Sequence, residues 1–304
     1  MMHGGTSLFQ SILSYAGKRY FWVALILTLV SLAIFSSPSV VEPRNGGTWQ
    51  GYTLGTIGAL LIAWLLWLGI RKRQYKASIG TYQGWVSAHV YLGVAVLFIA
   101  SFHSAFQLGF NIHSLSYVLL LAVVLSGLWG MWAYLTLPER TSKIRSGISR
   151  DACLSNLAEV DQCILATAQQ CKTDVAKSCE SAVVRTVIGG GVRDILMGID
   201  RSKIELAMFS DESKNKEVLT SNSQQKSILD WLAKRLSLSL GGKETESLQE
   251  LLSLFARRRV YIFRIREDIR LHAWLKLWLY IHVPMSLGLL ISLIAHILSV
   301  FLYW

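Results

Sequence analysis

Long uncharged, apolar stretches alternate with short charged segments along the chain. The four stretches are Tyr20 to Val41, Asn45 to Ile70, Ala77 to Pro138 and Leu277 to Trp304. A helix that crosses a bilayer needs about 20 mostly apolar residues. The first, second and fourth stretches can each hold one such helix. The third stretch can hold two, separated by the polar residues 107–116. The pattern therefore predicts five membrane-spanning helices, near residues 20–36, 52–70, 84–106, 115–135 and 277–302.

Composition supports this interpretation and excludes an ordinary soluble enzyme. Hydrophobic residues make up 52% of the chain and charged residues only 16%, whereas soluble domains carry about 25% charged residues. We therefore expect an all-α membrane protein whose five helices form one bundle. Helices one to four occupy residues 1–135 and helix five residues 277–304, with a mostly helical insertion at residues 136–276.

The basic residues of the short connections predict the orientation. Cytoplasmic loops of membrane proteins are enriched in Lys and Arg. Basic residues cluster on one side of the predicted spans, at Lys18, Arg19, Arg71, Lys72, Arg73, Lys76, Arg140, Lys143, Arg145, Arg150, Arg264, Arg266, Arg270 and Lys276, and the opposite side has only Arg44. The N-terminus and the insertion are therefore expected in the cytoplasm and the C-terminus outside, in a bacterial inner membrane. The formal net charge of +11 follows from this bias, so no nucleic-acid partner is expected.

The insertion contains three predicted helices and all four cysteines. The helices are expected near residues 152–186, 224–238 and 245–272, and the last can run directly into the fifth span. Cytoplasmic placement favours reduced thiols for Cys153, Cys163, Cys171 and Cys179. Their spacing matches no zinc or iron–sulfur pattern. They are read as ordinary helix residues, with a metal role, or disulfides if the topology is inverted, as open alternatives.

Four histidines inside the predicted spans carry the candidate chemistry. His89 and His103 lie in the third span, and His282 and His296 in the fifth. Both pairs are 14 residues apart, which returns a helix to within about 40° of the same face and separates the two rings by about 21 Å along the axis. Because one span lies between them, the third and fifth helices run parallel. His89 is therefore expected at the depth of His282, and His103 at the depth of His296.

Two imidazoles at each of two depths are the ligands that two stacked bis-histidine haems require. A haem iron with two histidine ligands has no open position, which suits electron transfer. Any single histidine in a membrane helix is equally well explained as a helix–helix contact. The same interval repeated in two parallel helices favours haem ligation instead.

The stretches Trp85–His89, His103–Ser104, His282–Met285 and His296–Trp304 resemble the di-haem membrane cytochromes b. This group includes respiratory cytochrome b and the membrane domain of ferric reductases. The resemblance implies two b-type haems held by the pairs His89–His282 and His103–His296, in an electron-transfer subunit of an oxidoreductase complex. It also implies partners such as flavin, iron–sulfur or c-type cytochrome proteins, or quinone. The long insertion before the fifth span differs from the short connections of those proteins.

Two other functions remain open from the residues alone. One is a quinone or ferric reductase with its substrate site on this chain, and the other is a haem-free scaffold or transporter. The third and fifth spans contain no acidic residue, Lys or Arg that would form an ion path, which disfavours a transporter.

Further residues near the expected haems have two interpretations each. Arg44 is either a partner of the outer haem propionates or a solvated loop residue. Glycines in the spans either let a porphyrin approach the backbone or allow close helix packing; these are Gly93, Gly127, Gly130 and Gly288. His113 is interpreted as a surface-loop residue, with approach to an outer-haem propionate or a quinone as the alternative.

Overall fold

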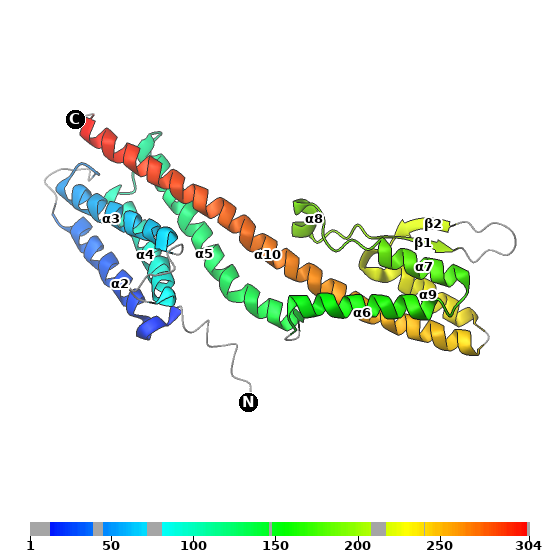
Figure 1. Ribbon diagram of the computed structural model, residues 1–304. Helices are drawn as coiled ribbons and strands as arrows, with labels where there is room; N and C mark the ends of the chain where they lie inside the picture. Colours follow the sequence, from blue (N-terminus) through cyan, green and yellow to red (C-terminus); the bar gives the residue numbers. More distant parts are fainter. Residues whose placement is uncertain are drawn as a thin grey trace. The chain divides into compact units, whose positions relative to one another are not determined.

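The computed structural model describes residues 13–38, 45–71, 81–145, 148–207, 217–239 and 241–302. The chain divides into two compact units (Figure 1). The first, here called the membrane unit, comprises residues 1–136 and 275–304. The second, the insertion unit, comprises residues 137–274. Each unit is described by itself below.

The described residues contain five helices long and apolar enough to cross a membrane, as the sequence predicted. These are α2 (Tyr15–Ser36), α3 (Trp49–Arg71), α4 (Tyr82–His103), α5 (Ile112–Arg145) and α10 (Lys243–Leu302). Helix α4 ends at His103 rather than near residue 106, because Ala105 and Phe106 have left-handed φ angles of 48° and 59°. Helix α5 continues past residue 135, and α10 joins the predicted helix 245–272 to the fifth span in one 60-residue helix.

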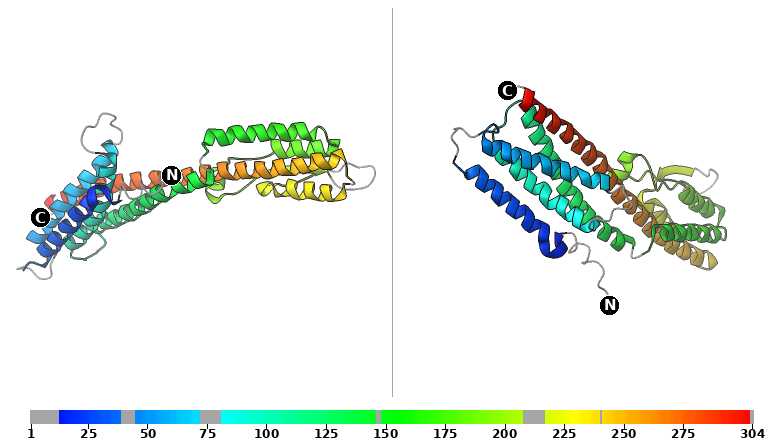
Figure 2. Two further views of the ribbon diagram at one scale, coloured as in Figure 1. Left: turned by 90° about the horizontal axis from the view of Figure 1, so that it is seen from below. Right: turned by 60° about the vertical axis from the view of Figure 1, so that its left-hand side comes forward.

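Apolar side chains join the helices of the membrane unit. Ala24 of α2 packs with Ala88, Leu92 and Ala95 of α4, and the views of Figures 1 and 2 agree that these two helices lie side by side. A second cluster joins α3, α4, α5 and α10 through Ile62, Val96, Leu120 and Leu289. Large apolar side chains such as Trp22 and Ile26 remain exposed on the outer face of α2. In a membrane protein this face is suited to contact with lipid.

Helices α5 and α10 approach each other closely at Gly130. A Cβ atom at this position would lie 2.0 Å from the Trp278 ring, so only glycine leaves room for the indole. The Trp278 Nε1–H donates a hydrogen bond to the Ser126 carbonyl at 2.8 Å. Of the two interpretations of Gly130, the structure favours close helix packing.

The insertion unit differs in two respects from the sequence prediction. The single helix expected over residues 152–186 is wrong: the chain forms α6 (Arg150–Ala168) and α7 (Thr173–Val184), because Lys172 adopts an extended conformation with φ −62° and ψ 152°. The short helix α8 (Val192–Met197) follows. Two strands, β1 (Lys203–Ala207) and β2 (Glu217–Ser221), then pair antiparallel, with Lys203 opposite Ser221. The alternation of Lys203, Ile204, Glu205 and Leu206 is a strand signal that the helical prediction overlooked.

The core of the insertion unit lies between helices and the β1 strand. The 3₁₀ turn η1 (Ser223–Gln225) leads into α9 (Lys226–Leu238). Side chains of α6, α7, β1, α9 and the first turns of α10 form the buried cluster, which includes Ile164, Cys179, Ile204, Leu232 and Phe255. The unit thus has a hydrophobic core of its own.

All four cysteines are free thiols. Cys153 and Cys179 are buried, whereas Cys163 is exposed. Burial, with a smaller contribution from the nearby Cys171, raises the pKa of Cys179 to about 12. The thiol therefore carries almost no thiolate, which is the reactive form.

We expect iodoacetamide at pH 8 to alkylate Cys163 at least ~100-fold faster than Cys179 in the folded protein, since Cys179 is both buried and protonated. Mass spectrometry of the labelled peptides gives the two rates. A Cys163→Ser variant supplies the matched control and should remove only the fast reaction. Equal rates at the two sites would contradict the buried position of Cys179.

Candidate haem sites

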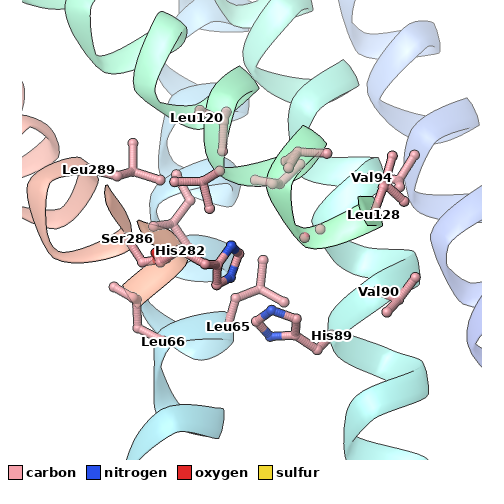
Figure 3. A pocket seen from close by; sticks show the side chains of 16 residues that line it. Leu65, Leu66, His89, Val90, Val94, Leu120, Leu128, His282, Ser286 and Leu289 are labelled. Atoms are coloured by element: carbon pink, nitrogen blue, oxygen red, sulfur yellow. The ribbon is translucent and has the colours of Figure 1, made fainter. Parts of the chain in front are cut away.

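His89 and His282 line one apolar cavity within the membrane unit (Figure 3). His89 comes from α4 and His282 from α10, and both imidazole rings are directed toward the space between the helices. Most of the remaining wall is formed by aliphatic side chains, among them Leu65, Leu120 and Leu289, together with Ser286 and two glycines. The structure thus brings together the two histidines that the sequence placed at the inner depth.

The Ser126 hydroxyl lies within hydrogen-bonding distance of both His282 and a backbone carbonyl. The Ser126 hydroxyl lies 2.9 Å from the Val123 carbonyl, to which it donates its only proton. The same oxygen lies 2.7 Å from the Nδ1 of His282, and while its proton is donated to Val123 it accepts the Nδ1 proton. The Nε2 atom of a neutral His282 consequently has a free lone pair, which is the state of a metal ligand.

The Nδ1 atom of His89 is buried and has no hydrogen-bond partner within the described ranges. A buried polar atom without a partner is costly, so each one in a native structure calls for an explanation. Glycines lie beside this pair in the cavity wall. Gly93 has nothing within 4 Å of a Cβ position, and a Cβ at Gly127 would lie 3.4 Å from His282. The space beside these glycines and the lack of a partner among the described residues leave the His89 Nδ1 without a contact that fixes the orientation of the ring.

His103 and His296 come together 14 residues further along the same two helices. Their ring centroids are 5.9 Å apart, and the rings are perpendicular. The Nδ1–H of His103 donates to the Gly51 carbonyl of α3 at 2.8 Å, which leaves its Nε2 free as well. A Cβ at Gly55, one turn further along α3, would lie 2.8 Å from the His103 ring. Glycine at this position makes room for the imidazole.

A third histidine lies at this level, and its contact with His296 was not predicted from the sequence. His113, interpreted from the sequence as a surface-loop residue, lies in the first turn of α5 and contacts His296 directly through the two Nδ1 atoms. The centroids of these two rings are 4.5 Å apart. The sequence signal for this contact is that His113 lies in the short connection between the predicted third and fourth spans, on the same side of the membrane as His103 and His296.

The donors fit haem better than a bare metal ion. Among the described residues, no group of three or more His, Cys, Asp or Glu side chains could hold a metal ion. A pair of imidazoles suits a haem, because the porphyrin supplies the other four nitrogens. The cavity beside His89 and His282 has a volume of about 80 Å³, below the ~300–1,000 Å³ of typical ligand pockets. The aliphatic lining would have to move outward to admit a porphyrin.

Neither Arg44 nor the comparisons with known proteins adds evidence on what these sites bind. Arg44, the proposed partner of the outer propionates, lies outside the described residues, and its role stays a prediction. Comparisons with protein-family models, curated proteins and solved structures found no match to this chain. The function is therefore inferred from the residues of the chain itself.

Proposed function

We propose that this protein is a di-haem b-type cytochrome subunit that carries electrons across a membrane between redox partners or quinone. The observation that carries the proposal is the arrangement of four histidines on α4 and α10. They are 14 residues apart on each helix, and each histidine of α4 lies near one histidine of α10. His89 and His282 share a cavity, and His103 and His296 lie ring to ring.

The roles of the residues follow from this arrangement. His89 and His282 would hold one haem, and His103 and His296 the other; in His282 and His103 the Nδ1 contacts leave Nε2 as the ligating atom. The bound haem iron would supply a one-electron redox centre with no position for a substrate. Ser126 and Gly51 accept the Nδ1 protons of His282 and His103, which keeps these rings in the tautomer that a ligand needs. The aliphatic wall around His89 keeps water out of the inner site.

The proposal includes an orientation and a set of partners. Following the distribution of Lys and Arg, the N-terminus and the insertion unit lie in the cytoplasm of a bacterial cell, and the C-terminus lies outside. Electrons then pass between the cytoplasmic and outer levels. A flavin, iron–sulfur or c-type cytochrome protein, or quinone, exchanges electrons with each level.

The decisive experiment measures haem in the purified full-length protein. A pyridine haemochrome assay is expected to give two b-type haems per chain, with optical spectra of six-coordinate, low-spin iron. The double variant His89→Ala/His103→Ala is the matched control and should contain neither haem. Wild-type protein without haem, or with far fewer than two per chain, would refute the proposal.

A further inference from the structure

His113 is a residue without a role in the function proposed above, although it contacts one of the four histidines. Its Nδ1 atom contacts the Nδ1 atom of His296. The two rings are perpendicular, with centroids 4.5 Å apart. His113 belongs to α5, whereas the four proposed ligands belong to α4 and α10.

The contact lies at one end of a regular series between the antiparallel helices α5 and α10. Ser116 meets Ser292 through their hydroxyl groups, Ser126 meets His282, and Gly130 lies against Trp278. Each step along α5 is matched by a nearly equal step back along α10. The register that places Ser126 beside His282 therefore also places His113 beside His296.

The protons of the two rings can be assigned if His296 binds iron. A histidine that binds through Nε2 keeps its proton on Nδ1. The Nδ1–H of His296 must then donate to the Nδ1 of His113, whose own proton is on Nε2. His113 thus accepts the Nδ1 proton of His296, as the Gly51 carbonyl accepts that of His103 and the Ser126 hydroxyl that of His282.

We propose that His113 is the positioning residue of His296. This inference rests on the proposed function, because it assumes that His296 is a haem ligand. The hydrogen bond from His296 holds the ring in one tautomer and orientation, and it increases the electron density that the imidazole donates to iron. Such partners of ligating histidines tune the metal as well as orienting its ligand.

The test compares two substitutions of His113 in the full-length protein with haem bound. In His113→Phe the acceptor is lost, so His296 donates less electron density to iron, and the midpoint potential of the outer haem shifts upward. In His113→Gln the side-chain carbonyl can accept the same hydrogen bond, and the potential stays closer to that of the wild type. The potential of the inner haem is unchanged in both. Optical redox titration and the EPR spectrum of the oxidised protein measure these effects.

Leu115→Ala is the matched control, since Leu115 lies in the same turn of α5 and is exposed. It should leave both potentials unchanged. Two results would overturn the inference in protein that contains both haems as wild type. One is an unchanged outer potential in His113→Phe. The other is loss of the outer haem in both His113 variants to the extent seen in His296→Ala, which would make His113 a ligand. Absence of haem from the wild type would instead refute the proposed function.

Discussion

The variants His89→Ala and His282→Ala are expected to lose the same haem, and His103→Ala and His296→Ala are expected to lose the other. The reason is spatial: His89 and His282 line one cavity, whereas His103 and His296 lie with their ring centroids 5.9 Å apart. In the proposed di-haem protein, removing one ligand would leave the iron with a single imidazole. Each alanine variant should therefore contain about half of the wild-type haem, or retain one haem as a high-spin species.

Redox titration followed by visible spectra distinguishes the two haems and assigns each variant to one of them. His272→Ala is a suitable control, because His272 lies in the insertion unit and its Nδ1 contacts the Asp268 carbonyl. This variant should keep both haems. If the spectrum of His89→Ala matches that of His296→Ala, the pairing between α4 and α10 is wrong.

Arg258→Ala is expected to destabilise the insertion unit by about 1.5–3 kcal/mol, the typical worth of hydrogen bonds to a charged group, because the remaining partner Asp161 is 23% exposed and can be solvated. The Arg258 side chain is only 2% exposed. Its Nε lies 2.6 Å from Asp161 of α6, and its Nη1 lies 3.0 Å from Thr186 and 2.7 Å from Gln225. Alanine would leave these three groups without the guanidinium that joins them.

The loss can be measured in the full-length protein through Cys179, which belongs to the core of the insertion unit. Thiol labelling at increasing urea concentrations reports the opening of this core, and the midpoint should fall markedly in Arg258→Ala. Arg258→Lys should recover only part of the loss, because an ammonium group lacks the planar fork of guanidinium donors. The control Arg257→Ala changes an exposed neighbour and should alter stability by no more than about 0.5 kcal/mol. A wild-type midpoint in Arg258→Ala would show that the network does not support the fold.

Local properties of the sequence were sufficient to predict the helices of the membrane unit. Apolarity over about 20 residues defines a span, and all five predicted spans correspond to helices. The insertion was harder, because its helices are short and its strands have five residues each. Ile204 is buried against helices that come from before and after it in the chain, so its strand conformation depends on contacts that no local pattern reveals.

The identity and spacing of the four span histidines were determined by the sequence alone, because the helical repeat converts an interval of 14 residues into a shared face. The partners of these histidines were decided only by the tertiary structure. Ser126, Gly51 and His113 reach His282, His103 and His296 from other helices. Which residue meets which depends on the register of packed helices, and that register is set where glycine admits a ring, at Gly130 against Trp278 and at Gly55 against His103. A hydrophobic pattern specifies which residues form a helix, whereas the fit of side chains across two helices specifies how far one is displaced along the other.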